Sequence, residues 1–326
     1  MVPTERIATG SIQTVLIYVE YTKKLFNSVY YPLVRAYARR FLKDKPADPL
    51  LRGMVALAFL VVYRYWPDFV RPRRFGEKLW SRMLMSRHPL LTTISDKRLV
   101  RDYVAKKVGT GHFIPLLWSG ADPEAIPYDR LPDRFVIKTN HGCRYVVLVT
   151  DKARADRAAI AAQLKTWLSE NYAEDTYLGI AWGYKNIKPM ILIEEFIDDH
   201  GQPPIDYKFY CFSGRTELIT VHFDRHKNPR SVSVDRDFVR LRFRPGFKQH
   251  DIDPPKPRNF AAMLSLAESL AVGFNFIRVD LYSLQDKIYF GELTPYPVGV
   301  ELFRSFDISS LDETLGEKWG SNPEWV

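Results

Sequence analysis

The chain of 326 residues is 26% charged and 46% hydrophobic, which is typical of a soluble globular protein with two or three structural lobes. It has no repeat period, low-complexity tract or collagen-like bias, and this excludes fibrous and disordered classes. The two cysteines, Cys143 and Cys211, are too few for a disulfide scaffold or a four-cysteine zinc site. We therefore expect a protein of the reducing cytoplasm.

The net charge of +9 and the pI near 9.3 favour anionic partners such as nucleotides, acidic sugars or phospholipid surfaces. A basic surface that is merely solvated is the alternative. No nucleic-acid-binding motif is present, so we expect no nucleic-acid partner. The first ten residues lack the basic-then-apolar order of a signal peptide.

Residues 1–72 read as a basic helical region without a catalytic motif. The apolar run Met54–Tyr63 is too short to span a bilayer and predicts a buried helix. The segment Tyr21–Lys45 mixes basic and aromatic residues at roughly helical spacing, which fits two arrangements. In the first arrangement the segment rests on a membrane or a partner protein, and in the second it packs on the chain's own body. Residues 1–70 are thus a candidate for peripheral contact with the inner face of the membrane or with a glycan-assembly enzyme.

Beyond Pro72, residues 73–125 are predicted as a helical segment, in which Ser95 or Asp96 caps a helix that Gly109 and Gly111 end. Residues 122–132 form a Pro-rich loop. The apolar period then changes, and the class is α/β or α+β. We expect helices at 156–171 and 260–272, and strands at 134–138, 145–149, 190–197, 207–212, 217–223, 276–282 and 287–293.

The last expected hairpin, residues 276–293, is the most informative segment. Arg278 and Asp280 share one strand face, and Glu292 and Thr294 share another. If the two strands pair about their turn, both acids point to the same side. Two carboxylates and a nearby oxygen suit a hard cation such as Mg²⁺ when phosphates supply the other ligands. A solvated acidic face is the alternative.

Lys138 ends an expected strand and is followed by a tight loop through Gly142. A cation at a strand end, followed by exposed backbone N–H groups, suits a polyphosphate. The GxxxxGK[ST] motif, the Rossmann glycines and the protein-kinase motif set are absent from the sequence. A nucleotide site of those kinds is therefore excluded.

From about Arg74 to Gly316 the sequence resembles the ATP-grasp superfamily, and more closely the TupA-like ATP-grasp family linked to polysaccharide and teichuronopeptide synthesis. The matching segments, in order, are RFGEKLW, SDKRLVRDYV, LPDRFVIKTNHG, YKNIKPMILIEEFI, DYKFYCFSG, FIRVDLY and KIYFGELTPYP. The resemblance implies two α/β subdomains that clamp ATP. The nucleotide-binding subdomain would span residues 126–196, and the C-terminal subdomain with the metal site would span residues 197–326.

The resemblance also implies roles for individual residues toward the nucleotide. Lys97 is similar to the lysine that reaches the α-phosphate, and Lys138 to the lysine that meets the α- and β-phosphates. The other implied positions are the phosphate-covering loop at Asn140, His141 and Gly142, the adenine hinge at Glu194, Glu195, Phe196 and Ile197, and the ribose acid Asp206 with Lys208 beyond it on the same strand face.

Asp280, Glu292 and Thr294 occupy the three positions that bind magnesium in the family. Arg278 resembles the arginine that steadies an acyl phosphate and the tetrahedral oxyanion. Arg225, at the end of another strand, resembles a family position and is a candidate for binding an anionic carboxyl substrate. The implied catalytic residues are therefore Arg278, Lys138 and Arg225.

The sequence departs from the family pattern at two positions. The third metal position is usually Asn, whereas Thr294 offers a weaker oxygen. The loop of relatives reads His-Gly-Ser-Gly, and here Cys143 and Arg144 end it. Without the second Gly the loop is stiffer, or Arg144 contacts phosphate, or it faces solvent. Cys143 is a structural thiol or a nucleophile, and His141 is a base, a phosphate contact or a loop-ordering hydrogen-bonding residue.

The implied activity is ATP-dependent ligation of a carboxylate to an amine through an acyl phosphate, with ATP and Mg²⁺ as cofactors. The family suggests an amino acid and a carboxylated sugar or nucleotide-sugar as substrates in surface polysaccharide biosynthesis. One alternative is a phosphotransferase that acts on a hydroxyl of a sugar or small molecule. Another is a non-catalytic nucleotide-binding partner of glycan-assembly enzymes.

Overall fold

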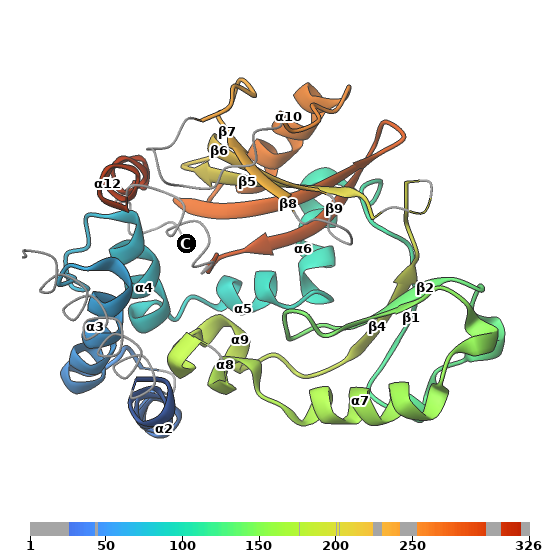
Figure 1. The fold of residues 1–326 in the computed structure, drawn as a ribbon, viewed down its shortest axis with the longest axis horizontal. Helices are drawn as coiled ribbons and strands as arrows, with labels where there is room; N and C mark the ends of the chain where they lie inside the picture. The colour runs from blue at the N-terminus through green and yellow to red at the C-terminus, as the bar shows by residue number, and fades with distance from the viewer. Residues whose placement is uncertain are drawn as a thin grey trace, which may run out of the picture.

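The protein was analysed as a computed structural model. The residues that the structure describes are 26–42, 45–175, 177–199, 201, 203–223, 230–241, 253–297 and 308–320. The predicted site residue Arg225 and the first residues of the Tyr21–Lys45 segment lie outside this description. The described elements form two antiparallel sheets with helices packed around them (Figure 1).

Four helices open the described chain: η1 (Phe26–Tyr30), α2 (Tyr31–Phe41), α3 (Pro49–Tyr63) and α4 (Phe75–Met85). The carboxylate of Asp48 caps α3 by accepting from the backbone nitrogen of Leu51 at 2.8 Å. The predicted buried helix at 54–63 is confirmed as part of α3, whose Val55 and Phe59 are fully buried. Among the described residues, no helix has the length and apolar character needed to cross a membrane.

Helix α2 packs on the body of the chain. Val34 and Ala38 are buried on its inner face, and Gly179 of the short η5 helix (Tyr177–Gly179) approaches so closely that an added Cβ would meet that of Ala38 at 3.3 Å. Arg39 forms an ion pair with Glu174 at 2.9 Å. The inner side of α2 therefore packs on the chain's own body, which is one of the two expected arrangements, while Leu33 and Phe41 are exposed and contact with a membrane or partner stays a prediction.

Helices α5 (Pro89–Ser95) and α6 (Leu99–Val108) follow. Asp96 Oδ1 accepts from the backbone nitrogens of Arg98 and Leu99 at 2.7 and 3.2 Å and so satisfies donors in the turn that leads into α6. The helix begins at Leu99 with Arg98 as its N-cap, so Asp96 precedes the cap position. Gly109, with a φ of 80°, ends α6 as predicted. Residues 116–120 form strand β1 (Leu116–Gly120), within the segment predicted as helical. That prediction was wrong here because this short strand depends on pairing with a strand far along the chain.

The first sheet has the strand order β1-β4-β2-β3, with β2 (Phe135–Thr139), β3 (Val146–Val149) and β4 (Ile191–Glu195). Its apolar face, which includes Phe135 and Ile193, packs with Leu164 of α7 (Arg157–Ser169). The predicted strands and the helix at 156–171 are confirmed. The predicted strand at 190–197 is shorter in the structure, since β4 ends at Glu195. Two 3₁₀ turns, at Pro123–Ala125 and Tyr128–Arg130, lie in the predicted loop, and a third is at Lys152–Arg154.

The second sheet has the order β7-β6-β5-β8-β9. Its strands are β5 (Ile205–Phe212), β6 (Arg215–Phe223), β7 (Arg230–Val234), β8 (Phe276–Leu284) and β9 (Lys287–Thr294). Helix α10 (Phe260–Ala271) packs on β5, β6 and β8. The helix and the β5–β6 and β8–β9 hairpins are confirmed, and the last turn places Gln285 and Asp286 at φ of 49° and 61°. Short helices α8 (Tyr172–Asp175) and α9 (Trp182–Lys185), like β7, were not predicted.

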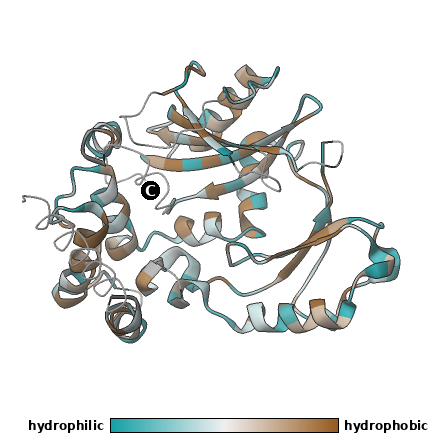
Figure 2. Ribbon diagram, in the orientation of Figure 1, coloured by the Kyte–Doolittle hydropathy of each residue, from teal (hydrophilic) through white to brown (hydrophobic). Residues whose placement is uncertain are grey.

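The N-terminal helices and the second sheet share one apolar core. Buried side chains of α3 and α4 join those of β5 and β8 in a single cluster, and hydrophobic segments face this interior (Figure 2). Helix α12 (Ile308–Lys318) packs on α4, where Asp312 accepts from Gly76 N at 2.6 Å and from the Tyr65 hydroxyl at 2.7 Å. The described part of the N-terminal region is therefore integral to the fold. The predicted subdomain limits after residues 72, 125 and 196 stay a prediction.

Candidate functional site

Charged side chains form a row across the second sheet. Lys208 on β5 lies in register with Asp280 on β8, and Asp280 lies in register with Glu292 on β9. Because strand side chains alternate, these residues share one face, while Val279 and Leu281 are buried on the face toward α10. The prediction that both acids of the hairpin point to the same side is thus confirmed.

Arg278 holds the two acids together. Its Nε and Nη2 donate to the two oxygens of Asp280 at 2.7 and 2.8 Å, and Nη2 also donates to Glu292 Oε1 at 2.6 Å. The Thr294 hydroxyl donates to the same Glu292 oxygen at 2.6 Å. Lys208 forms ion pairs with Asp280 and, at 2.7 Å, with Asp206. The network is a compact set of opposite charges on one sheet face.

Burial and charge act in opposite directions on these groups. Burial raises the pKa of Asp280 to about 6, although Arg278 and Lys208 lower it. Burial also raises the pKa of Glu292, but Arg278 and Lys208 outweigh it and hold that pKa well below its usual range. Burial lowers the pKa of Lys208, but Asp280, Asp206 and Glu292 together outweigh it and keep the pKa above its usual value. Glu292 and both cations therefore stay charged at neutral pH.

A β-bulge lies beside the two acids. The register between β8 and β9 shifts after Asp280, and Gly291 is the extra residue on β9. A Cβ at Gly291 would lie 3.0 Å from the backbone oxygen of Asp280 and 3.1 Å from the Tyr282 ring. Glycine therefore permits the close approach that sets Glu292 next to Asp280.

The oxygen atoms of this network fit a hard cation only in part. Oxygens of Asp280, Glu292 and Thr294 lie 2.6–3.0 Å from Arg278 Nη2, so three hard donors already surround one positive charge. No cluster of three or more His, Cys, Asp or Glu side chains suited to a metal occurs among the described residues. The set fits Mg²⁺ if phosphate oxygens complete the coordination.

Lys97 links the loop after β2 to the helices α5 and α6. The Nζ atom of Lys97 donates to the backbone oxygen of Gly142. The backbone nitrogen of Lys97 donates to the backbone oxygen of Asn140 at 3.1 Å. Burial lowers the pKa of Lys97, Glu292 raises it and Lys138 lowers it, so both of these charges lie within electrostatic reach of Lys97. Lys97 is thus placed between the two sheets.

The side chains of Asn140 and His141 serve the loop itself. Asn140 donates to Asp96 Oδ2 at 3.1 Å and accepts from Met190 N at 2.7 Å. His141 is buried, and its Nε2 contacts the backbone oxygen of Trp167 at 3.0 Å. Both residues are predicted nucleotide contacts, and that stays a prediction; in the structure their side chains hydrogen-bond to neighbouring parts of the chain and order the loop. The loop-ordering hydrogen bond expected as one role of His141 is present.

The backbone of the loop after β2 favours glycine at two positions. A Cβ at Gly142 would lie within 2.4 Å of the Tyr145 ring, so only glycine fits that position. Arg144 has a φ of 67°, in the left-handed region that favours glycine, which is the residue the resemblance expects there. The loop therefore keeps the backbone shape that a glycine would adopt more easily.

Lys138 and Glu194 form a second charged cluster on the first sheet. Lys138 Nζ lies 2.6 Å from Glu194 Oε2, and Arg101 of α6 lies 3.3 Å from the other oxygen of that buried acid. Beyond Glu194, the backbone nitrogen of Glu195 donates to Pro115 at 3.0 Å. The predicted hinge residues Phe196 and Ile197 follow the end of β4, and the Arg134 guanidinium lies 4.2 Å from the centre of the Phe196 ring.

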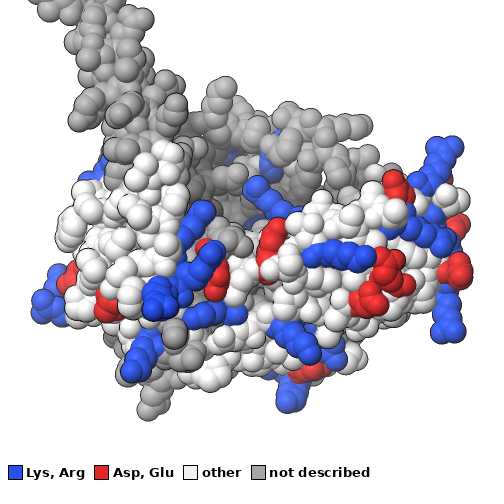
Figure 3. Space-filling view, turned by 90° about the horizontal axis from the view of Figure 1, so that it is seen from below, with Lys and Arg blue, Asp and Glu red and all other residues white. Residues whose placement is uncertain are grey.

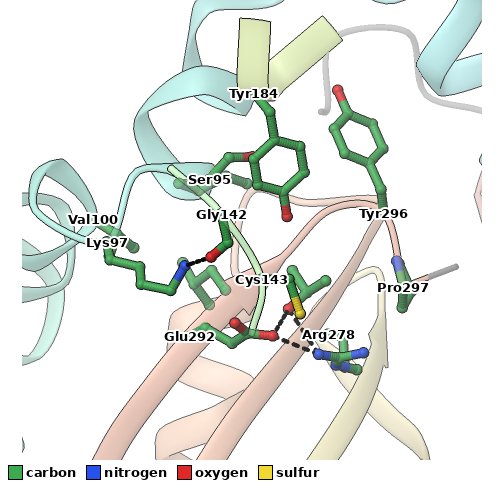
Figure 4. Close-up of a pocket in the computed structure, with 13 residues that line it drawn as sticks. Ser95, Lys97, Val100, Gly142, Cys143, Tyr184, Arg278, Glu292, Tyr296 and Pro297 are labelled. Carbon is green, nitrogen blue, oxygen red and sulfur yellow. Dashed lines mark hydrogen bonds and ion pairs between the residues drawn. The ribbon is translucent and has the colours of Figure 1, made fainter. Parts of the chain in front are cut away.

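A pocket of about 170 Å³ opens between these parts of the protein (Figure 4). Lys97 and Gly142 form one side, and Arg278 and Glu292 lie at the bottom of the view. The rings of Tyr184 and Tyr296 close the opposite end, with their centres 6.1 Å apart. Its full lining is Ile94, Ser95, Lys97, Val100, Gly142, Cys143, Tyr184, Arg278, Glu292, Leu293, Thr294, Tyr296 and Pro297.

The structure groups half of the predicted residues and adds others. Lys97, Gly142, Arg278, Glu292 and Thr294 line one pocket. The ion pair of Arg278 with Asp280 extends this group to Lys208 and Asp206, whereas Lys138 and Glu194 form their own cluster on the first sheet. Sequence reasoning missed three contributors: Arg101, Tyr184 and Tyr296. Tyr296 lies in the GELTPYP segment and shares the alternation of Thr294, whereas Tyr184 lies in a four-residue helix that has no sequence signal.

The arrangement agrees with the family match. The profile described as "TupA-like ATPgrasp" matches residues 77–319, which is well over half of the chain. The chain belongs to the TupA-like ATP-grasp family. Its fold is the ATP-grasp fold, preceded by N-terminal helices. No curated protein matches the chain significantly.

Solved structures similar to this TupA-like protein are distant. The D-alanine–D-alanine ligase of Helicobacter pylori is 16% identical over 70% of this chain and 61% of the ligase, with a TM-score of 0.38. The enzyme of Bacillus anthracis, complexed with ATP, is 16% identical over 71% of this chain and 64% of its own, with a TM-score of 0.39. The macrocyclase MdnC of Microcystis aeruginosa, bound with precursor peptide MdnA, is 11% identical over 72% of this chain and 64% of the macrocyclase, with a TM-score of 0.38. The match thus spans less than two thirds of each of these proteins.

Proposed function

We propose that this protein is an ATP-dependent ligase that joins a carboxylate to an amine. The observation that supports the proposal most is the pocket in which Lys97 and Arg278 lie with Glu292. It combines cations for a polyphosphate with the acid Glu292, and Asp280 lies next to Glu292 through the shared hydrogen bonds of Arg278. Cys211 does not suit a nucleophilic role, since it is buried and burial raises the pKa of its thiol.

Different residues would bind the nucleotide, hold Mg²⁺ and stabilise the transferred phosphoryl group. Lys97 and Lys138 hold the negative charge of the triphosphate, and the backbone of the loop at Gly142 covers it. The backbone beyond Glu194 edges the adenine, and Asp206 accepts from the ribose. Asp280, Glu292 and Thr294 would hold Mg²⁺, which when bound supplies positive charge to the phosphate oxygens. Arg278 stabilises the charge that develops on the phosphoryl group during transfer.

Two steps complete the proposed reaction. A carboxylate oxygen of the substrate attacks the γ-phosphorus, the bond to the β–γ bridging oxygen breaks, and ADP leaves. The amine nitrogen then attacks the acyl carbon, the bond to the phosphate oxygen breaks, and the nitrogen loses a proton as the amide forms. Both steps require alignment of the reactants and exclusion of water, which a narrow pocket between two sheets provides.

For the substrates, we propose an amino acid and a carboxylated sugar or nucleotide-sugar in surface polysaccharide biosynthesis, in the cytoplasm. The family link to polysaccharide synthesis supports this pair, as does the end of the pocket formed by Tyr184 and Tyr296, since aromatic faces suit sugar rings. Arg225 remains our candidate for the substrate carboxylate.

A crossed substrate screen tests the proposal. Purified protein is incubated with Mg²⁺, ATP, single amino acids and single uronic acids or uronic-acid nucleotides, and ADP, AMP and phosphate are resolved. Ligation predicts ADP and phosphate only when a carboxylate and an amine are both present. A phosphorylated acceptor formed without an amine would instead indicate a phosphotransferase. ATP binding without turnover for any pair would indicate a non-catalytic nucleotide-binding subunit.

A further inference from the structure

Exposed apolar side chains gather on the N-terminal helices. Of the thirteen large apolar side chains that are exposed among the described residues, seven lie between positions 29 and 70. We define the outer face as Val29, Leu33 and Phe41 of η1 and α2 together with Leu50 and Leu57 of α3. Leu33 and Leu57 are 58% and 42% exposed, so these are side chains in contact with solvent.

The two helices bury their inner stripes in one core and lie against each other. Val34 and Ala38 of α2, and Val55 and Phe59 of α3, are buried in one common core. The Tyr37 hydroxyl donates to the Asp48 carboxylate that caps α3 at 3.1 Å, so the helices lie against each other. Since both helices bury one stripe in the same core, their opposite stripes point away from it. Figure 1 places α2 and α3 at the edge of the molecule.

The charge of the chain is concentrated in the same region. Residues 1–74 contain thirteen Lys and Arg against five Asp and Glu, a net charge of +8 out of the +9 of the whole chain. The exposed Arg40, Lys45 and Arg64 form no ion pair with another described residue. Seen from below, the surface at the left, where α2 lies, is mostly uncharged and has Lys and Arg together with a few Asp and Glu along its border (Figure 3). The rest of the chain is almost neutral.

We propose that the outer face attaches the protein to an anionic membrane surface. Apolar side chains that project from helices lying on a bilayer enter the boundary between headgroups and acyl chains, and neighbouring Lys and Arg pair with anionic headgroups. Residues 1–74 carry a net charge of +8, whereas the rest of the chain carries +1. This uneven distribution favours a uniformly negative surface as the partner over a protein of mixed charge. The contact is peripheral, because α3 spans only 15 residues.

Flotation of the full-length protein with vesicles tests this proposal. The vesicles contain either phosphatidylcholine alone or an equimolar mixture of phosphatidylcholine and phosphatidylglycerol. We expect binding to the mixed vesicles only, and a bound fraction that falls as salt is raised. The double variant Leu33→Glu, Leu57→Glu should bind at least about tenfold more weakly, because it places two acids in the interface. The double variant Arg40→Gln, Lys45→Gln should bind more weakly as well.

A matched control separates the outer face from exposed apolar groups in general. Leu148 and Val272 are 47% and 61% exposed and lie on β3 and at the end of α10, so Leu148→Glu, Val272→Glu makes the same chemical change elsewhere. The control should bind like the unsubstituted protein, and ATP affinity should be the same in all variants.

Three results would overturn the proposal. In the first, the full-length protein binds neither kind of vesicle. In the second, Leu33→Glu, Leu57→Glu binds as well as the control. In the third, sedimentation shows a dimer that this variant converts to a monomer, because the outer face would then be the interface between two copies. Equal ATP affinity in every variant distinguishes any of these failures from a failure of the proposed ligase function.

Discussion

The guanidinium group of Arg278 and the carboxylate of Glu292 meet across β8 and β9, where Nη2 donates to Oε1 at 2.6 Å. The same nitrogen donates to Asp280 Oδ2 at 2.8 Å, so Arg278 is the shared counter-charge of both acids. Any cation that uses these oxygens must compete with Arg278 for them. Ligand binding at this site is therefore coupled to the hydrogen bonds of the arginine.

Glu292→Gln should lower activity more than it lowers stability. The Glu292 side chain is 40% exposed, so water compensates in part for the lost ion pair with Arg278, while the substitution removes an anionic ligand. We expect turnover to fall by about two orders of magnitude, as is typical for loss of one preorganised charge, with a smaller loss in the free energy of unfolding than in Asp280→Asn. Titration with ATP, with and without Mg²⁺, should show that the variant loses the gain in affinity that Mg²⁺ provides. Near-native turnover would remove Glu292 from the metal site.

Asp280→Asn should behave differently, because the Asp280 side chain is 2% exposed and lies between two cations. Its loss leaves Lys208 and Arg278 with reduced compensation in a buried position. We expect the free energy of unfolding to fall by about 3 kcal/mol in addition to the loss of activity. Urea unfolding of Asp280→Asn and Glu292→Gln under the same conditions compares their free energies of unfolding. Equal stability of the two variants would contradict the burial argument.

Lys138 should contribute to ATP affinity through its charge. Lys138→Ala removes a cation that lies 2.6 Å from Glu194, whereas Lys138→Arg keeps the charge and changes its shape. A charge-assisted hydrogen bond contributes about 1.5–3 kcal/mol, so calorimetry should show ATP affinity about tenfold lower or more in the Ala variant, and less affected in the Arg variant. Lys165→Ala, at an exposed ion pair with Glu124, is the matched control. Equal ATP affinity in Lys138→Ala and the control would place Lys138 outside the site.

His141 should make the stability of the protein sensitive to acid. Burial lowers the pKa of His141, the hydrogen bond to Trp167 raises it, and Lys97 lowers it, with a net lowering from 6.5. The unfolded chain therefore takes up a proton before the folded chain does as the pH falls through 6.5, and this lowers stability. Urea unfolding at pH 7.5 and pH 5.5, about one unit either side of the free histidine pKa, measures how much the free energy of unfolding falls with pH. This fall should be smaller in His141→Gln than in His88→Gln, which changes an exposed histidine. An identical loss in both variants would contradict this assignment.

Phe59 tests whether the N-terminal helices belong to the body of the protein. Its ring is fully buried and packs on Tyr63 at 4.0 Å and Trp80 at 5.5 Å between ring centres. Phe59→Ala should lower the free energy of unfolding by about 3–5 kcal/mol. Leu57→Ala, on the exposed side of the same helix, should cost far less. A small loss in Phe59→Ala would show that α3 contributes little to the stability of the body.

Much of the site followed from alternation along the strands. The β8–β9 hairpin was predictable because apolar residues alternate with Arg278, Asp280 and Glu292, and a two-residue turn joins the strands. The roles of Lys97 and Lys138 came from resemblance, since a single lysine has no pattern. Strand β1 and the pocket residue Tyr184 were not predictable, because short elements are stabilised by partners that lie far away in the chain.

The most direct measurement of the proposed chemistry follows oxygen from the carboxylate to phosphate. A carboxylate substrate found in the screen is labelled with heavy oxygen in its carboxyl group, and the products with ATP, Mg²⁺ and the amine are analysed by mass spectrometry. An acyl phosphate predicts ADP, the amide and phosphate that carries one heavy oxygen from the carboxylate. Phosphate without the label, or the label in AMP, would contradict ligation through an acyl phosphate.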